Sequence, residues 1–119
     1  MREDVDLQAH GRFHRSLPAC DEPAARDEVA ASKADLEGLL GAPCEHFSYP
    51  NGDFGPRDVE LARAAGYLSA RTVEPGVNTL ATDPYLLRAV CVLDDASINV
   101  LAMQMTMMGP TLKRLFGRR

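Results

Sequence analysis

Histidine is the residue type in this chain best suited to binding a metal ion or moving a proton near neutral pH. The sequence contains three: His10, His14 and His46. The first two are four residues apart, so both rings can share one metal ion if the chain bends at Gly11. In an extended strand the same residues would lie about 13 Å apart. The spacing indicates a two-histidine metal site that requires a bend. The alternative is that both rings fill or cap a loop.

Several carboxylates could serve as a third metal ligand or a catalytic group. Asp6 shares a strand face with His10, but at about 13 Å along the strand it is too far away to share an ion. Asp53 follows a Pro-Asn-Gly turn and is the better catalytic candidate, although a turn aspartate often bonds its own backbone instead. Asp83 and the pair Asp94-Asp95 have the pattern of loop or helix-cap residues. We expect His46, at a strand start, to be a packed or surface residue.

The elements that must position these groups follow from alternating apolar and amphipathic stretches, which predict an α/β fold with mostly parallel strands. The predicted strands cover residues 5–9, 45–49, 67–73 and 86–93, the last buried on both faces. A turn is predicted at 50–52. The predicted helices run from a cap at Asp21 to Gly41, from Pro56 to Gly66, and from Ala96 to Met108, with a last short helix at 112–116.

Composition narrows the class of protein. The chain has 119 residues, of which 45% are hydrophobic and 25% charged, as expected for one soluble globular domain. Residues 1–60 hold 6 Lys/Arg and 13 Asp/Glu. This acidic half argues against nucleic-acid binding, which needs a concentrated basic surface. The longest uncharged stretch, 96–112, is shorter than the roughly 20 residues of a membrane span.

The cysteines and the first residues predict a location. Cys20, Cys44 and Cys91 are an odd number at wide spacing without a C-x-x-C pair. This arrangement favours a reducing compartment over a disulfide framework. The first six residues lack the basic and apolar regions of a signal peptide. As written, the sequence therefore predicts a cytoplasmic protein.

Several segments, taken together in order and spacing, resemble one known family. They are DLQAHGRFHRSLP at 6–18, SKADLE at 32–37, FSYPNGDF at 47–54, ARAAGY at 62–67 and NTLATDP at 78–84. This pattern is similar to the C-terminal portion of polysaccharide deacetylases of the NodB-homology type (carbohydrate esterase family 4-like). The resemblance covers nearly all of residues 5–95. It implies a distorted (β/α) barrel that removes acetyl groups from glycans with a divalent metal, usually zinc.

The resemblance also implies roles for particular residues. His10 and His14 match the two histidine ligands of the family's metal. The family's Pro-x-Gly loop lines the substrate groove, which implies groove positions at Tyr49, Pro50 and Gly52. The backbone N–H of Asn51, within that loop, is the implied oxyanion donor.

Three family features have no match in this sequence. The family's aspartate pair, which supplies the catalytic base and the third metal ligand, should precede Val5 and is absent. Ser48 stands where many members carry an arginine, and no histidine follows His46 to act as general acid. We therefore expect a single truncated deacetylase-like domain over 1–119, with weak or absent activity alone, although complete relatives often act at the cell envelope.

The alternative function is a non-catalytic binding or assembly module. A barrel without its first strands exposes strand edges and apolar surface. The uncharged stretch from Ala96 to Met108 offers flexible methionines that could cover such a surface. We expect a homodimer, or a larger oligomer, with Met103, Met105 or Met107 in its interface.

Overall fold

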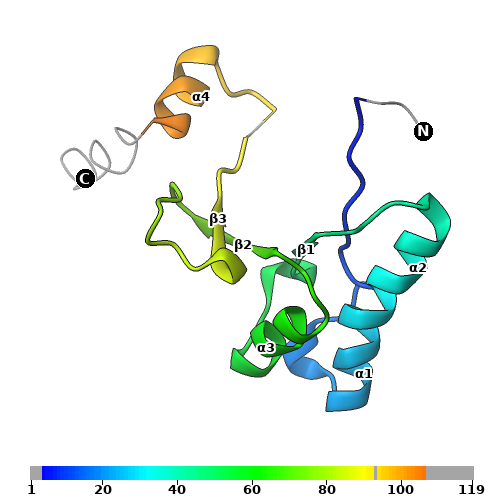
Figure 1. Cartoon of the computed structure of the whole chain (residues 1–119). Coiled ribbons are helices and arrows are strands. Elements are labelled where there is room, and N and C mark those ends of the chain that lie inside the picture. Colours follow the sequence, from blue (N-terminus) through cyan, green and yellow to red (C-terminus); the bar gives the residue numbers. More distant parts are fainter. Residues whose placement is uncertain (1–3, 93, 107–119) are drawn as a thin grey trace.

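The computed structural model describes residues 4–92 and 94–106 (Figure 1). The helices and strands follow one another in an order that fits the α/β prediction. They are η1 (Leu17–Ala19), α1 (Glu22–Arg26), η2 (Asp27–Ala31), α2 (Ser32–Leu40), β1 (His46–Ser48), η3 (Pro50–Gly52), α3 (Pro56–Ala64), β2 (Ser69–Pro75), η4 (Pro84–Leu86), β3 (Leu87–Ala89) and α4 (Ile98–Met105).

The three strands form one parallel sheet in the order β1-β2-β3. Ala9 adds a parallel bridge to Phe47 of β1, so the segment that leads to His10 lies at the outer edge of β1. Helices separate the parallel strands, as parallel connections require. An open parallel sheet with such helices is the architecture of a partial NodB-type (β/α) barrel, which confirms the predicted fold class.

The core lies between one face of this sheet and the helices. Ala9, Phe47 and Ala70 from the strand layer pack with apolar residues of α1, η2 and α3 in a single buried cluster. Tyr67, just before β2, is also in this cluster at 1% exposure. The opposite sheet face carries no such layer among the described residues, so polar side chains occupy it.

The first long helix begins and ends where the sequence predicts. Asp21 accepts a hydrogen bond from the Ala24 N–H, and Gly41, in a left-handed conformation, closes the C-terminus with its N–H on the Glu37 carbonyl. Between these caps, α1, η2 and α2 are continuous in sequence, and η2 is a π-helical turn. A π turn holds an additional residue relative to an α turn, and the sequence pattern gave no sign of it.

Two strand predictions are wrong in extent. In the stretch 5–9 only Ala9 pairs, and Val5 and Leu7 are each 45% exposed. In the stretch 86–93 the strand spans only Leu87–Ala89, and it is not buried on both faces. Val90 and Val92 are 39% and 56% exposed because no described element covers them.

The other element boundaries differ by a few residues. β2 starts at Ser69 rather than 67, because the Tyr67 N–H still bonds the Ala62 carbonyl of α3. α4 starts at Ile98 because Ser97 caps it through a hydrogen bond from the Val100 N–H. Figure 1 shows α4 standing away from the sheet. Met107, Met108 and the predicted helix at 112–116 lie outside the described residues.

Candidate functional site

The segment after Ala9 brings two of the three histidines together. Gly11 adopts φ +85°, which gives the bend that the four-residue spacing requires. His14 also has a positive φ of 58°. The Nε2 atoms of His10 and His14 lie 3.0 Å apart, with the ring centroids 4.7 Å apart in an edge-on arrangement. The predicted juxtaposition of the two rings is therefore present.

A backbone carbonyl of β1 orients the first ring. The Nδ1 atom of His10 lies 2.8 Å from the carbonyl oxygen of Ser48. A carbonyl only accepts hydrogen bonds, so His10 Nδ1 donates to it, and Nε2 is the ring nitrogen that faces His14. An imidazole fixed through its other nitrogen is the usual state of a metal-ligating histidine.

The two imidazoles fit one shared ion. Two ligand nitrogens, each about 2.0–2.1 Å from a tetrahedral zinc ion, lie about 3.3 Å apart. The observed Nε2 separation of 3.0 Å is close to that value. Among residues 4–92 and 94–106, no cluster of three His, Cys, Asp or Glu side chains is placed to hold a metal. The described part of the chain therefore offers two ligands.

The Pro-Asn-Gly turn forms a tight loop after β1. Pro50 is buried, and Asn51 is exposed with a left-handed backbone (φ 58°). Gly52 has φ +73°, and a Cβ built there would lie 2.3 Å from a methyl carbon of Val73. Only glycine fits this position, because both the backbone and the approach of β2 exclude a side chain.

Tyr49 is buried under this loop and does not line its surface. Its side chain is 1% exposed, and its hydroxyl donates to the Tyr85 carbonyl at 3.0 Å. Burial raises the pKa of the Tyr49 hydroxyl well above its usual value. Tyr49 is therefore a neutral hydrogen-bond donor within the fold.

Asp53 connects the loop to the histidine segment. Its Oδ2 accepts a hydrogen bond from the Ser16 hydroxyl at 3.1 Å, and Ser16 follows His14 by two residues. The carboxylate is exposed. The turn aspartate thus reaches across to the chain beyond His14.

The remaining sequence candidates lie elsewhere. Asp6 accepts a hydrogen bond from Gln8, and Asp83 caps the turn at Tyr85. Asp94 and Asp95 are exposed in a turn before α4. None of these four side chains has a described contact with the histidine pair.

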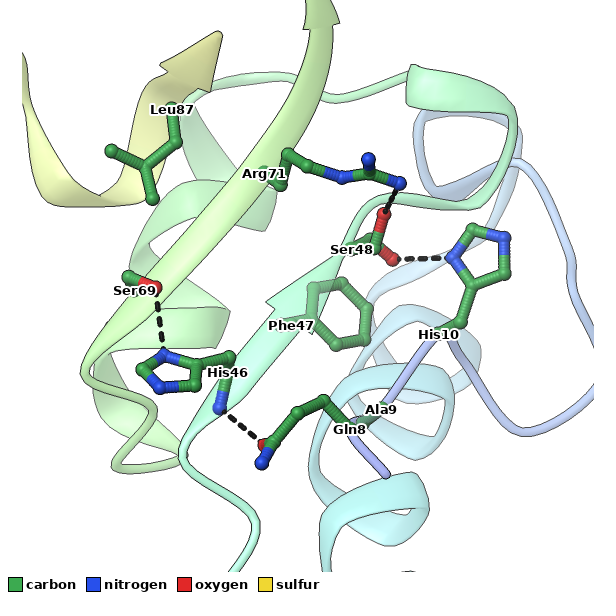
Figure 2. A pocket seen from close by; sticks show the side chains of 9 residues that line it. All are labelled: Gln8, Ala9, His10, His46, Phe47, Ser48, Ser69, Arg71 and Leu87. Carbon is green, nitrogen blue, oxygen red and sulfur yellow. Dashed lines mark hydrogen bonds between the residues drawn. The ribbon is translucent and has the colours of Figure 1, made fainter. Parts of the chain in front are cut away.

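A pocket of about 570 Å³ opens on the polar face of the sheet (Figure 2). His10, Ser48 and Arg71 lie together at one end, where Arg71 donates to the Ser48 hydroxyl at 3.4 Å. His46 is exposed at the other end, with Nδ1 2.9 Å from the Ser69 hydroxyl. None of the described residues that line this pocket is an Asp or a Glu.

Sequence reasoning missed two charged residues at this site, Arg71 and Glu28. Arg71 sits in an ordinary strand pattern, so nothing distinguished it. Glu28 gave a signal: it lies one position before Val29 and three after Ala25, both buried, so it occupies the core side of its helix. A carboxylate there requires hydrogen-bond partners.

Comparison with known proteins decides the family. The family model for polysaccharide deacetylase matches residues 1–70. The chain belongs to this family. No curated protein sequence matches the chain.

Solved structures agree on the fold. The Streptococcus pyogenes deacetylase PplD in complex with acetate has a TM-score of 0.80 at 22% identity, over 83% of this chain and 44% of that one. A polysaccharide deacetylase from Bacillus cereus has a TM-score of 0.77 at 22% identity, over 85% and 32%. IcaB from Ammonifex degensii has a TM-score of 0.61 at 27% identity, over 75% and 37%. The chain spans less than half the length of these proteins.

Within residues 4–92 and 94–106, no helix has the length and apolar character needed to cross a bilayer.

Proposed function

We propose that this chain carries the histidine half of a deacetylase site, which binds a divalent metal, most suitably zinc, and acts on acetylated glycans. The convergence of His10 Nε2 and His14 Nε2 at 3.0 Å carries this proposal. The hydrogen bond from His10 Nδ1 to the Ser48 carbonyl supports it, because it fixes the ring with Nε2 directed toward His14.

A divalent metal held by His10 and His14 would, when bound, polarise the acetyl carbonyl and activate a water molecule. The Asn51 N–H is proposed to donate to the oxygen on which negative charge develops. Pro50 and Gly52 shape the groove around Asn51, and the buried Tyr49 holds the loop from below.

Asp53 is the proposed substitute for the family's catalytic base. Its exposed carboxylate is held by Ser16 beside the histidine segment, so it is the best-placed proton acceptor among the sequence candidates. A positioned general base contributes about 10²–10⁴-fold to such reactions. Because the family's own aspartate pair has no match here, we expect turnover by this chain alone to be very low or absent.

Acetate release tests this proposal. The chain is incubated with chito-oligosaccharides or acetylated xylan, with and without added zinc, beside the variants His14→Ala and His46→Ala. We expect at most a slow, zinc-dependent release that disappears in His14→Ala and persists in His46→Ala. Zinc-dependent release that survives in His14→Ala would overturn the assigned site, and fast release would show that a substitute such as Asp53 replaces the missing base.

The second candidate function is an assembly module, and a specific observation favours it. Exposed apolar side chains gather on α4, where Ile98 is 80%, Met105 69% and Met103 44% exposed. Val5 and Leu7, in the segment before Ala9, are also exposed. Self-association into a homodimer or larger oligomer would cover such surfaces. In that case the histidines would be structural, or would bind a metal without a role in catalysis.

A further inference from the structure

A buried carboxylate lies directly behind the loop that joins the two histidines. Glu28 is 1% exposed, yet it belongs to a helix that otherwise packs through apolar residues. Its Oε2 accepts hydrogen bonds from the backbone N–H groups of Arg12 and Phe13 at 2.9 and 3.0 Å. Its Oε1 accepts a longer bond from the Phe13 N–H at 3.2 Å.

These hydrogen bonds hold a strained stretch of loop backbone in place. Arg12 and Phe13 are the residues between Gly11 and His14, both of which have positive φ. A non-glycine residue with positive φ costs free energy and persists only where its surroundings enforce it. The two N–H groups anchored on Glu28 fix the chain immediately before His14, so they hold the strained turn closed.

Glu28 lies within the π-helical turn. η2 spans Asp27–Ala31 and contains both Glu28 and the buried Val29. A single π turn changes the direction of side chains along a helix, and such turns are frequent at functional sites. Here the turn accompanies a carboxylate on the core side, aimed at the loop.

The loop fits closely against this carboxylate. A Cβ built on Gly11 would lie 2.7 Å from Glu28 Oε2 and 3.0 Å from Pro50 Cγ. The histidine loop, Glu28 and the Pro50 turn therefore pack as one unit. Arg15 Nε, 3.8 Å from Oε1, is the nearest cation paired with the buried charge.

We propose that Glu28 is a positioning residue that sets the distance between the His10 and His14 imidazoles and thereby the affinity of the site for a divalent ion. The inference about affinity rests on the proposed function, whereas the inference about ring placement does not. Outer groups that orient metal ligands typically account for about 10–100-fold in affinity. We expect a loss in that range when Glu28 can no longer accept both N–H groups.

The variant Glu28→Met keeps the length of the side chain but removes both carboxylate oxygens, so the Arg12 and Phe13 N–H groups lose their acceptor. Asp27→Asn is the matched control, since the described side-chain bond of this neighbouring carboxylate goes to the Arg12 guanidinium and not to the loop backbone, at 3.0 Å. Zinc affinity is measured by isothermal titration for both variants and the wild type. We expect about 10–100-fold weaker binding in Glu28→Met and an unchanged affinity in Asp27→Asn. Equal affinities of wild type and folded Glu28→Met would overturn the proposal.

A second measurement, on the metal-free protein, separates the role of Glu28 from the proposed metal function. Ring-to-ring nuclear Overhauser effects report the 4.7 Å approach of the imidazoles. We expect them in the wild type and in Asp27→Asn, and their loss in Glu28→Met. If the wild type binds no zinc, the metal function fails while this result still decides the role of Glu28; retained ring contacts in Glu28→Met refute that role. Should Glu28→Met fail to fold, Glu28→Asp, which keeps the charge but shortens the reach, carries the same expectations.

Discussion

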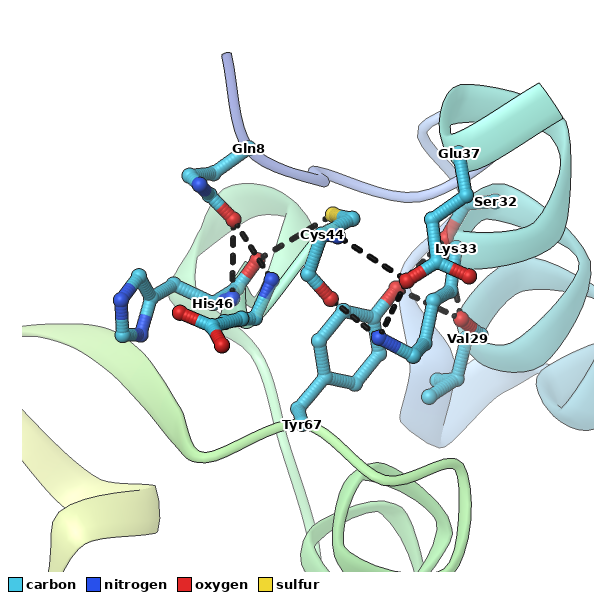
Figure 3. A network of polar contacts seen from close by, with 9 residues as sticks. Gln8, Val29, Ser32, Lys33, Glu37, Cys44, His46 and Tyr67 are labelled. Atoms are coloured by element: carbon cyan, nitrogen blue, oxygen red, sulfur yellow. Dashed lines mark hydrogen bonds and ion pairs between the residues drawn. The ribbon is translucent and has the colours of Figure 1, made fainter. Parts of the chain in front are cut away.

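The hydroxyl of Tyr67 donates a hydrogen bond to the carbonyl oxygen of Val29 at 2.9 Å (Figure 3). This bond joins the residue before β2 to the π-helical turn that contains Glu28. The Ser32 hydroxyl lies 3.3 Å from the same phenol oxygen, and the Lys33 ammonium lies 5.1 Å from the ring centroid. The Tyr67 side chain therefore links the segment just before β2 to the π-helical turn behind the histidine loop.

Tyr67→Phe should lower the free energy of unfolding by about 1 kcal/mol, because it removes a buried hydrogen bond while keeping the ring. Urea unfolding followed by circular dichroism measures this change. Leu39→Ala is the control, since Leu39 is 82% exposed and should shift stability by less than about 0.5 kcal/mol. A Tyr67→Phe variant as stable as the wild type would contradict the assigned role of the hydroxyl.

Stability should also fall in alkaline solution, in part because of Tyr67. Burial raises the pKa of its hydroxyl above the ordinary value of 10.0. The neutral form is favoured in the folded state, so this contribution is complete below pH 10 and is lost as the pH rises above that value. Unfolding curves between pH 8 and 11 should therefore show a decline that is smaller in Tyr67→Phe. An identical decline in both proteins would assign the effect to other groups.

The chain should bind one zinc ion through His10 and His14, with modest affinity because only two protein ligands are described. Elemental analysis after mild dialysis compares the wild type with the double variant His10→Ala plus His14→Ala. His46→Ala is the matched control, because its ring bonds Ser69 instead. Equal zinc in the wild type and the double variant would refute the site.

Light scattering at micromolar concentration should show a homodimer or a larger oligomer, with an interface that buries at least about 1,000 Å² in total. Replacing Met103 and Met105 together by glutamate should shift the chain toward monomer, since charges oppose burial of α4. Leu39→Glu, on an exposed position of α2, is the control and should leave the assembly unchanged. A folded, monomeric wild type would contradict this prediction.

Local signals in the sequence located the elements but not their burial. Asp21, Gly41 and Pro56 mark helix ends through capping and backbone constraints, and the structure places the helix ends there. The histidine spacing likewise required a bend, and Gly11 provides it. These features depend only on residues close in sequence.

Features that depend on distant contacts could not be predicted in this way. The apolar stretch 86–93 fits a strand buried on both faces, but burial requires a covering layer, and none of the described elements supplies one. The π turn at η2 contains Glu28 and Val29, which bond the histidine loop and Tyr67, 15 or more residues away in the sequence. A hydrophobic pattern with an α-helical period reports only the spacing of nearby residues, so it does not predict a π turn or its distant contacts.

The close approach of Gly52 to Val73 limits which loops this scaffold can carry. Any side chain at position 52 would need a different residue at 73 as well as a different backbone, so single substitutions there meet two obstacles at once. Asn51 has open space beside it but a left-handed backbone that favours asparagine, aspartate or glycine. Positions 51 and 52 therefore accept few substitutions. In a directed-evolution library, variation is better placed at Arg71, whose side chain lines the pocket on the sheet and meets neither constraint.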